Sequence, residues 1–213
     1  MINAYILRLL LFAPPVLFAL TLHECSHAWV AMRMGDPTAK SMGRVTLNPL
    51  KHLDPIGTIA LFVSGIFGWA KPVPVNPANF RDPAKGMLWV SLAGPLSNVF
   101  LAAVFAISLR LMDFITIPFV STTPYIYGPI LIMMKISILI NISLAVFNMI
   151  PIPPLDGNKV LMSLLPYNRA LSLSRLEPYG FMILMVLLVT GIVPKFLSPV
   201  VYFTAGFLTG GSF

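Results

Sequence analysis

Residues 21–29 read TLHECSHAW, and they interrupt an apolar run that extends from Leu9 to Met32. The whole chain has only three histidines and seven Asp and Glu residues. Two of these histidines and one of the glutamates fall within five consecutive residues of this run. Ionisable side chains are costly inside an apolar segment and usually serve a function there. The stretch therefore indicates a functional site within this apolar segment.

The composition indicates a membrane protein. Of 213 residues, 57% are hydrophobic and only 10% are charged, whereas a soluble domain has about 25% charged residues. The net charge of +7 is typical of basic cytoplasmic loops in such a protein. We expect no nucleic-acid partner, because no soluble basic domain is predicted. The single cysteine excludes an internal disulfide.

The apolar runs predict an all-α polytopic membrane protein with about five to six membrane segments. Counted from Val16 to Met34, the first helix has 19 residues and is roughly 28 Å long, which is enough to cross the hydrocarbon core. Pro14 and Pro15 are expected to start or kink it, and we expect no cleavable signal before it. Further runs lie at residues 86–109, 128–149, 178–194 and 196–213.

A re-entrant and β-hairpin region is expected between the first two main spans. The apolar run at 55–70 is short for a crossing, and residues 71–77, KPVPVNP, favour extended structure or a hairpin. Lys and Arg are found at 33–54, 71–85 and 158–177 but not at 113–128. The positive-inside rule places the three basic regions in the cytoplasm if residues 55–70 dip into the membrane and return.

The HECSH sequence has the spacing of a metal site. On a helix, His23 and His27 lie on one face one turn apart, so both imidazoles can reach one ion. Glu24 lies about 100° around the helix, where it can contact a water molecule. In zinc proteases with this pattern the histidines hold zinc and the glutamate is the general base. The alternative is a pair of polar residues that hydrogen-bond to neighbouring helices.

Asp156 is the best candidate for a third ligand. It follows PIPPL (151–155), where three prolines force the backbone out of a helix at the end of a transmembrane run. The carboxylate can thus turn back toward the membrane interior, although a turn aspartate ahead of Gly157 is an ordinary alternative. His52 lies in a basic loop, and we expect it to be exposed rather than a ligand.

Three motifs together resemble the site-2 protease family of intramembrane zinc metalloproteases. H-E-x-x-H in a membrane helix is followed by NMIPIPPLDG (148–157), and GPLSN (94–98) matches a third family element. FGWAKPVPVN (67–76) is similar to the loop-and-strand region of the compact bacterial and archaeal members. The resemblance runs from about residue 12 to residue 166.

The resemblance implies one zinc ion per chain, held by His23, His27 and Asp156, with Glu24 as the base. It implies that Asn148 and Asn98 lie near the substrate backbone or the oxyanion. A buried amide can donate to a developing oxyanion, while an interhelical hydrogen bond is the alternative role for Asn98.

The implied enzyme is a zinc metalloendopeptidase that acts in regulated intramembrane proteolysis. It would hydrolyse peptide bonds within or near transmembrane segments of membrane-protein substrates, in the cell membrane, at a site reached from the cytoplasmic side. We expect a single domain, residues 1–213, without a PDZ or CBS domain. Its catalytic core would span about 12–166, with packing or gating helices at 178–213. The oligomeric state is not predicted.

Two other readings stay open at this point. A membrane metal transporter or metal-binding protein would also need intramembrane ligands, although it would distribute them along a path through several helices. An inactive protease-like scaffold is the other alternative. Within the protease reading, KPVPV could present an edge strand to which an unwound substrate adds.

Overall fold

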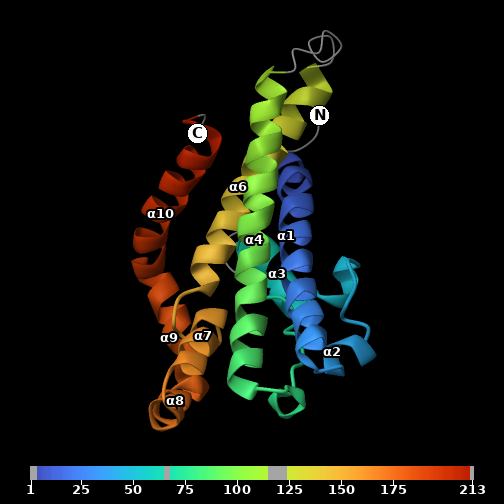
Figure 1. Ribbon diagram of the computed structural model, residues 1–213. Helices are drawn as coiled ribbons and strands as arrows, with labels where there is room; N and C mark the ends of the chain where they lie inside the picture. The colour runs from blue at the N-terminus through green and yellow to red at the C-terminus, as the bar shows by residue number, and fades with distance from the viewer. Residues whose placement is uncertain (1–3, 65–67, 115–123, 212–213) are drawn as a thin grey trace.

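The computed structural model describes residues 4–64, 68–114 and 124–211, and this part of the chain is built almost entirely of helices (Figure 1). The elements are α1 (Ala4–Met34), α2 (Thr38–Ser41), η1 (Pro49–Lys51), α3 (Pro55–Ser64), η2 (Pro77–Asn79), α4 (Pro83–Phe114), α6 (Pro124–Asn148), α7 (Asp156–Leu164), α8 (Tyr167–Ser174), α9 (Glu177–Val189) and α10 (Ile192–Thr209). The described part of the chain is therefore all-α, as predicted.

Four of the described helices are long and apolar enough to cross a membrane. The spans are Leu9–Met34 in α1, Pro83–Met112 in α4, Tyr127–Asn148 in α6 and Ile192–Thr209 in α10. A fifth crossing is formed if α8 and α9, which meet at a bend of 63°, count as one broken span. The predicted loop at 113–128 falls largely on residues outside the described part of the chain.

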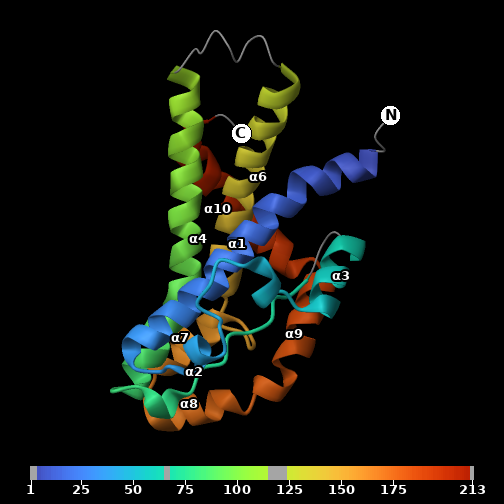
Figure 2. The same cartoon turned by 90° about the vertical axis from the view of Figure 1, so that its right-hand side faces the viewer.

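Small residues let the spanning helices approach one another closely. Alanines 102 and 106 of α4 and 205 of α10 are almost completely buried, and they pack with Ile138 and Ile142 of α6. Close packing of small side chains is the usual way in which helices associate in lipid. Helix α1 crosses α4 obliquely (Figure 2). It continues as a helix through Pro14 and Pro15, where the sequence predicted a start or a kink.

In the region between the first two spans, α2 lies at one end of the bundle and α3 lies part-way along α1 (Figure 2). Helix α3 has ten residues, too few to cross a membrane. The predicted hairpin is reduced to one antiparallel bridge between Leu53 and Ala70, and no strand is found in the described residues. Pro72 and Pro74 explain this, since neither can donate to a ladder. The bridge brings both ends of the segment containing α3 side by side.

Candidate metal centre

Helix α1 supplies two neighbouring imidazoles to the interior of the bundle. His23 and His27 are one turn apart and only 4% and 7% exposed. Their Nε2 atoms lie 3.0 Å from each other. The sequence-based prediction that both rings share one face of the helix is therefore confirmed by the geometry.

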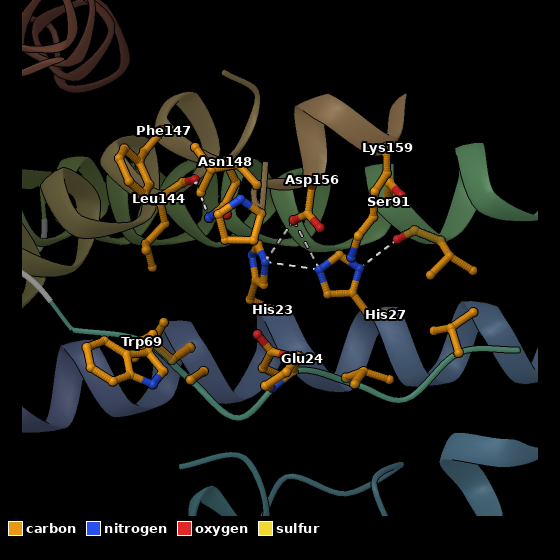
Figure 3. A pocket seen from close by; sticks show the side chains of 18 of the residues that line it. His23, Glu24, His27, Trp69, Ser91, Leu144, Phe147, Asn148, Asp156 and Lys159 are labelled. Carbon is orange, nitrogen blue, oxygen red and sulfur yellow. Dashed lines mark hydrogen bonds and ion pairs between the residues drawn. The ribbon is translucent and has the colours of Figure 1, made fainter. Parts of the chain in front are cut away.

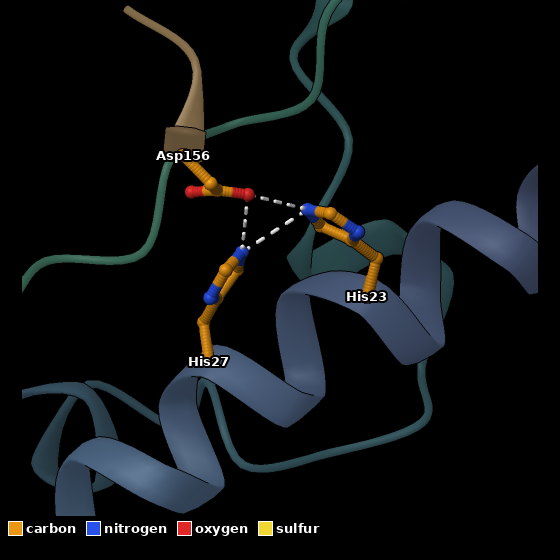
Figure 4. Close-up of side chains that lie close together, drawn as sticks. All are labelled: His23, His27 and Asp156. Carbon is orange, nitrogen blue, oxygen red and sulfur yellow. Dashed lines mark hydrogen bonds and ion pairs between the residues drawn. The ribbon is translucent and has the colours of Figure 1, made fainter. Parts of the chain in front are cut away.

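Asp156, the first residue of α7, completes the cluster from the other half of the chain (Figure 4). Its Oδ2 atom lies 3.2 Å from Nε2 of His23 and 3.2 Å from Nε2 of His27. Burial alone would raise the pKa of Asp156, but positive charge on the imidazoles of His27 and His23 outweighs burial and lowers it. A cation bound at the same place would favour the carboxylate in the same way.

The turn between α6 and α7 makes this approach possible. The prolines end the helical backbone after Asn148, and Leu155 is extended just before Asp156. At Gly157 a β-carbon would overlap the backbone of Met149 and Ile150. Glycine at this position thus permits the tight return that brings the aspartate to the histidines.

The outer nitrogens of both rings are hydrogen-bonded. His27 Nδ1 donates to the carbonyl oxygen of Val90 at 2.6 Å, and a carbonyl only accepts. His23 Nδ1 lies 2.5 Å from Oδ1 of Asn98. Asn98 Nδ2 donates to Asn141 Oδ1 at 2.8 Å.

The orientation of the Asn98 and Asn141 side-chain amides is fixed by the backbone carbonyl of Ser137. Asn141 Nδ2 donates to the carbonyl oxygen of Ser137 at 2.8 Å, so Asn141 Oδ1 is the acceptor that faces Asn98. Asn98 must then turn its own oxygen toward His23, which carries its proton on Nδ1. In neutral rings both Nε2 atoms therefore present lone pairs to the carboxylate oxygen of Asp156.

This donor set fits zinc. Three acceptor atoms that face one another in a buried place repel one another unless a cation lies among them. Tetrahedral zinc with bonds of about 2.0–2.1 Å holds its ligand atoms about 3.3 Å apart, close to the observed 3.0–3.2 Å. Hydrogen bonds from the outer nitrogen to a carbonyl or amide are typical of metal-binding histidines. Among the described residues, His23, His27 and Asp156 form the one cluster suited to a metal ion.

Gly94 of α4 makes room for the rings. A β-carbon at this position would overlap both imidazoles, at Nε2 of His27 and at Cε1 and Nε2 of His23. The glycine of the GPLSN motif thus permits α4 to lie directly against the cluster.

A cavity of about 610 Å³ opens beside the cluster (Figure 3). Glu24 lines it from α1 and is not part of the metal-binding group. Most of the other lining side chains are apolar, and Lys159 of α7 is the one Lys or Arg among them. The cavity walls also include Trp69, which lies edge-on to Phe181 of α9 at 6.1 Å between ring centres.

The two predicted asparagines occupy different places. Asn148 lines the cavity and donates through Nδ2 to the carbonyl oxygen of Leu144 at 3.0 Å. Asn98 is completely buried and contacts His23 instead of the cavity. The contacts of Asn98 therefore match its alternative role, an interhelical hydrogen bond, rather than a place beside the substrate.

His52 is not the exposed loop histidine that the sequence suggested. It is 1% exposed, and its Nε2 atom lies 2.8 Å from the carbonyl oxygen of Thr46. The loop is ordered around it by polar contacts with the backbone, which the loop's basic composition does not reveal. His52 lies outside the metal-binding cluster, as expected.

A bundle of apolar helices with a buried cluster of two histidines and an aspartate defines a membrane metalloprotein. Residues 111–191 match the model of Peptidase family M50. The protein named "Putative zinc metalloprotease YwhC" from Bacillus subtilis is 40% identical over 184 residues, which cover 82% of this chain and 78% of that relative. The protein named "Putative zinc metalloprotease Rip2" from Mycolicibacterium smegmatis is 30% identical over 189 residues, 87% of this chain and 69% of that relative. No solved structure matches the chain.

The chain therefore belongs to peptidase family M50, the site-2 protease family, and it is a metalloprotease.

Proposed function

We propose that this chain is an intramembrane zinc endopeptidase in which His23, His27 and Asp156 hold one zinc ion and Glu24 is the general base. The observation that carries the proposal is the convergence of three buried acceptor atoms within 3.2 Å of one another. Zinc, when bound, acidifies a water molecule and polarises a peptide carbonyl.

The chain's own residues have separate tasks in this reaction. Glu24 faces the cavity (Figure 3), where it accepts a proton from water and returns it to the leaving amine. Asn148 uses one of its two amide hydrogens on Leu144, so the second can donate to the substrate carbonyl as negative charge develops. Asn98 keeps the proton of His23 on Nδ1 and so orients the ring.

We infer that the substrate is an unwound transmembrane segment that lies along residues 70–76. Val73 and Val75 line the cavity, and no hydrogen bond of the described residues uses their backbone. An extended peptide can pair with such free amide and carbonyl groups. Substituting Val75→Pro removes one donor, whereas Val75→Ala keeps it. Unchanged cleavage of a transmembrane test protein by Val75→Pro would exclude this mode of binding.

We further propose a location in the cell membrane with the metal centre reached from the cytoplasmic side. The basic regions around α2, η2 and α8 lie at one end of the molecule (Figure 1), which the positive-inside rule assigns to the cytoplasm. His23 precedes Arg33 by ten residues, or about 15 Å of helix. The segment containing α3 would then enter the membrane and return, since its two ends meet at Leu53 and Ala70.

The chain would work as one domain, residues 1–213. The catalytic core at about 12–166 contains all proposed site residues, and the helices at 178–213 complete its walls. Helix α9 contributes Phe181 and Leu184 to the cavity, and α10 packs in the core through Val201 and Ala205.

The test is cleavage of single-span membrane proteins by the purified chain in liposomes, with Glu24→Gln and Lys195→Gln compared in parallel. A protease loses cleavage with the first change and retains it with the second. Transport of zinc into the liposomes without any cleavage would favour the transporter reading instead.

A further inference from the structure

Residues 70–76, which include Val73 and Val75 of the cavity wall, are anchored at both ends by buried charged side chains outside the metal centre. At the C-terminal end of this segment, the backbone N–H of Asn76 donates to Oδ2 of Asp36 at 2.7 Å. The side-chain amide of Asn79 donates to Oδ1 of Asp36, also at 2.7 Å. Asp36 has no exposed surface, so this carboxylate is committed to these contacts.

Asp36 is also fixed to the helix that carries the histidines. Its backbone N–H donates to the carbonyl oxygen of Ala31 at 2.9 Å, and Thr38 donates to Oδ1 through its backbone N–H and its hydroxyl. Gly35 has a φ of 113°, and a β-carbon there would lie 3.1 Å from the carbonyl oxygen of Asn79. The end of α1 and the 76–79 turn are therefore in direct contact.

The near end of the segment is held by Arg44, which is 3% exposed. Its guanidinium donates to the carbonyl oxygens of Lys71, at 2.5 Å, and of Pro72, at 3.2 Å. The backbone N–H of Lys71 donates to the backbone carbonyl oxygen of His52 at 2.8 Å. Burial of a charged group is costly unless it is hydrogen-bonded, and the carbonyl oxygens of Lys71 and Pro72 supply hydrogen bonds to this guanidinium.

Between these anchors lie Val73 and Val75, whose backbone N–H and C=O groups make no hydrogen bonds with the described residues. Val75 also packs against the cluster of Ala31, Phe80 and Val90. The segment is thus held at its ends and along one apolar side, while its middle remains available. Such an arrangement fixes the register of the segment without using the groups that a bound peptide would need.

We propose that Asp36 and Arg44 are positioning residues that set the register of the substrate peptide at the metal centre. They hold residues 70–76 at a fixed place relative to α1, so that a peptide paired with Val73 and Val75 presents one particular bond to Glu24. This inference rests on the proposed function and adds to it the origin of cleavage-site precision.

The experiment compares wild type with Asp36→Asn, Asp36→Ala, Arg44→Lys and Arg44→Met. Asp36→Asn replaces one acceptor oxygen with a donor at unchanged volume, and Arg44→Lys keeps the charge without the two-pronged contact. Asp82→Asn is the matched control, because Asp82 also accepts a backbone N–H, from Lys85, but caps α4 away from the cavity. Each protein is assayed for zinc content, for kcat and KM on a single-span test protein, and for the bonds cleaved.

We expect the Asp36 and Arg44 variants to retain zinc and to raise KM about tenfold, as loss of one charge-assisted contact would do. Their cleavage should spread to neighbouring bonds, while Asp82→Asn cuts as wild type does. Unchanged KM and a single cut in folded Asp36→Asn and Arg44→Lys would overturn the proposal. Loss of zinc in these two variants would also overturn it, because they would then act on the metal centre.

Amide hydrogen exchange tests the same inference without relying on activity. In Asp36→Asn, exchange at Asn76 should rise at least severalfold, whereas exchange in α4 should not change. Equal exchange at Asn76 in wild type and variant would contradict the proposed anchor. Faster exchange together with a wild-type protein that cleaves nothing would refute the protease function while leaving the anchor in place.

Discussion

Asn98 Oδ1 lies 2.5 Å from Nδ1 of His23 and is held in that orientation by Asn141. One buried amide thus determines which nitrogen of the histidine faces Asp156. The chain of contacts extends from α1 through α4 to α6, so the packing of three helices is coupled to the chemistry of one ring.

Replacing Asn98 should weaken metal binding without removing a ligand. In Asn98→Ala the Nδ1 proton of His23 has no acceptor, and the ring can rotate or change tautomer. We expect zinc affinity to fall roughly 10- to 100-fold, measured by competition with a chelator. Asn168→Ala, which changes an exposed residue of α8, is the control. Equal affinities in the two variants would show that Asn98 does not orient the ring.

Glu24→Gln should separate binding from catalysis. Glutamine occupies the same space but cannot accept the proton, so cleavage should fall by roughly 100- to 10,000-fold. Zinc content should be unchanged, since Glu24 is not among the metal-binding side chains. Elemental analysis and cleavage of a single-span test protein measure the two properties on the same sample. A variant that lost its zinc would assign Glu24 to the metal instead.

Gly94→Ala should disrupt the site through one methyl group. The added carbon would overlap both imidazoles, and a displacement of about 1 Å commonly costs about 100-fold in activity. Gly206→Ala in α10 is the matched control, because a β-carbon there has open space around it. The ratio of zinc content between the two variants is the measurement. Full zinc occupancy in Gly94→Ala would mean that α4 can move away at no cost.

Asp36 gives a prediction about pH. Burial raises its pKa, but hydrogen bonds from Thr38, Asn79 and Asn76 outweigh burial and lower it from the usual 3.8. A carboxyl with a lowered pKa in the folded state stabilises the fold above its unfolded value, and this stabilisation is lost as pH falls through the folded pKa. Asp36→Asn should therefore cost about 2 kcal/mol near neutral pH.

This difference in unfolding free energy should shrink below pH 3.8. Thermal unfolding in detergent at a series of pH values measures it for wild type and variant. A gap that stayed constant down to the lowest pH at which wild type folds would show that the charge of Asp36 does not contribute.

The sequence predicted the parts of the site that depend on side-chain spacing. His23 and His27 meet because a helix places residues i and i+4 together, and Asp156 returns because prolines end α6. The all-α membrane fold followed from apolar runs of sufficient length. The helical spacing, the proline turn and the apolar runs are local features, whereas the grouping of Asp156 with the two histidines was implied by the family resemblance.

Features that depend on tertiary contacts were not predictable in the same way. The carbonyl oxygen of Val90 accepts from His27, and a backbone group has no signature in the sequence. Asn141 has no motif of its own and acquires its role by facing Asn98. The burial of His52 and Asp36 likewise depends on how residues 35–82 fold onto the end of α1.

The most direct test of the metal centre is the zinc content of wild type and Asp156→Ala, purified in detergent, with Asp82→Ala as a control for loss of a partly exposed carboxylate outside the metal centre. We predict one zinc per chain in wild type and in Asp82→Ala, and a large loss in Asp156→Ala. Absence of zinc from wild type, or zinc content indifferent to Asp156, would contradict the proposal that α1 and α7 together hold the ion.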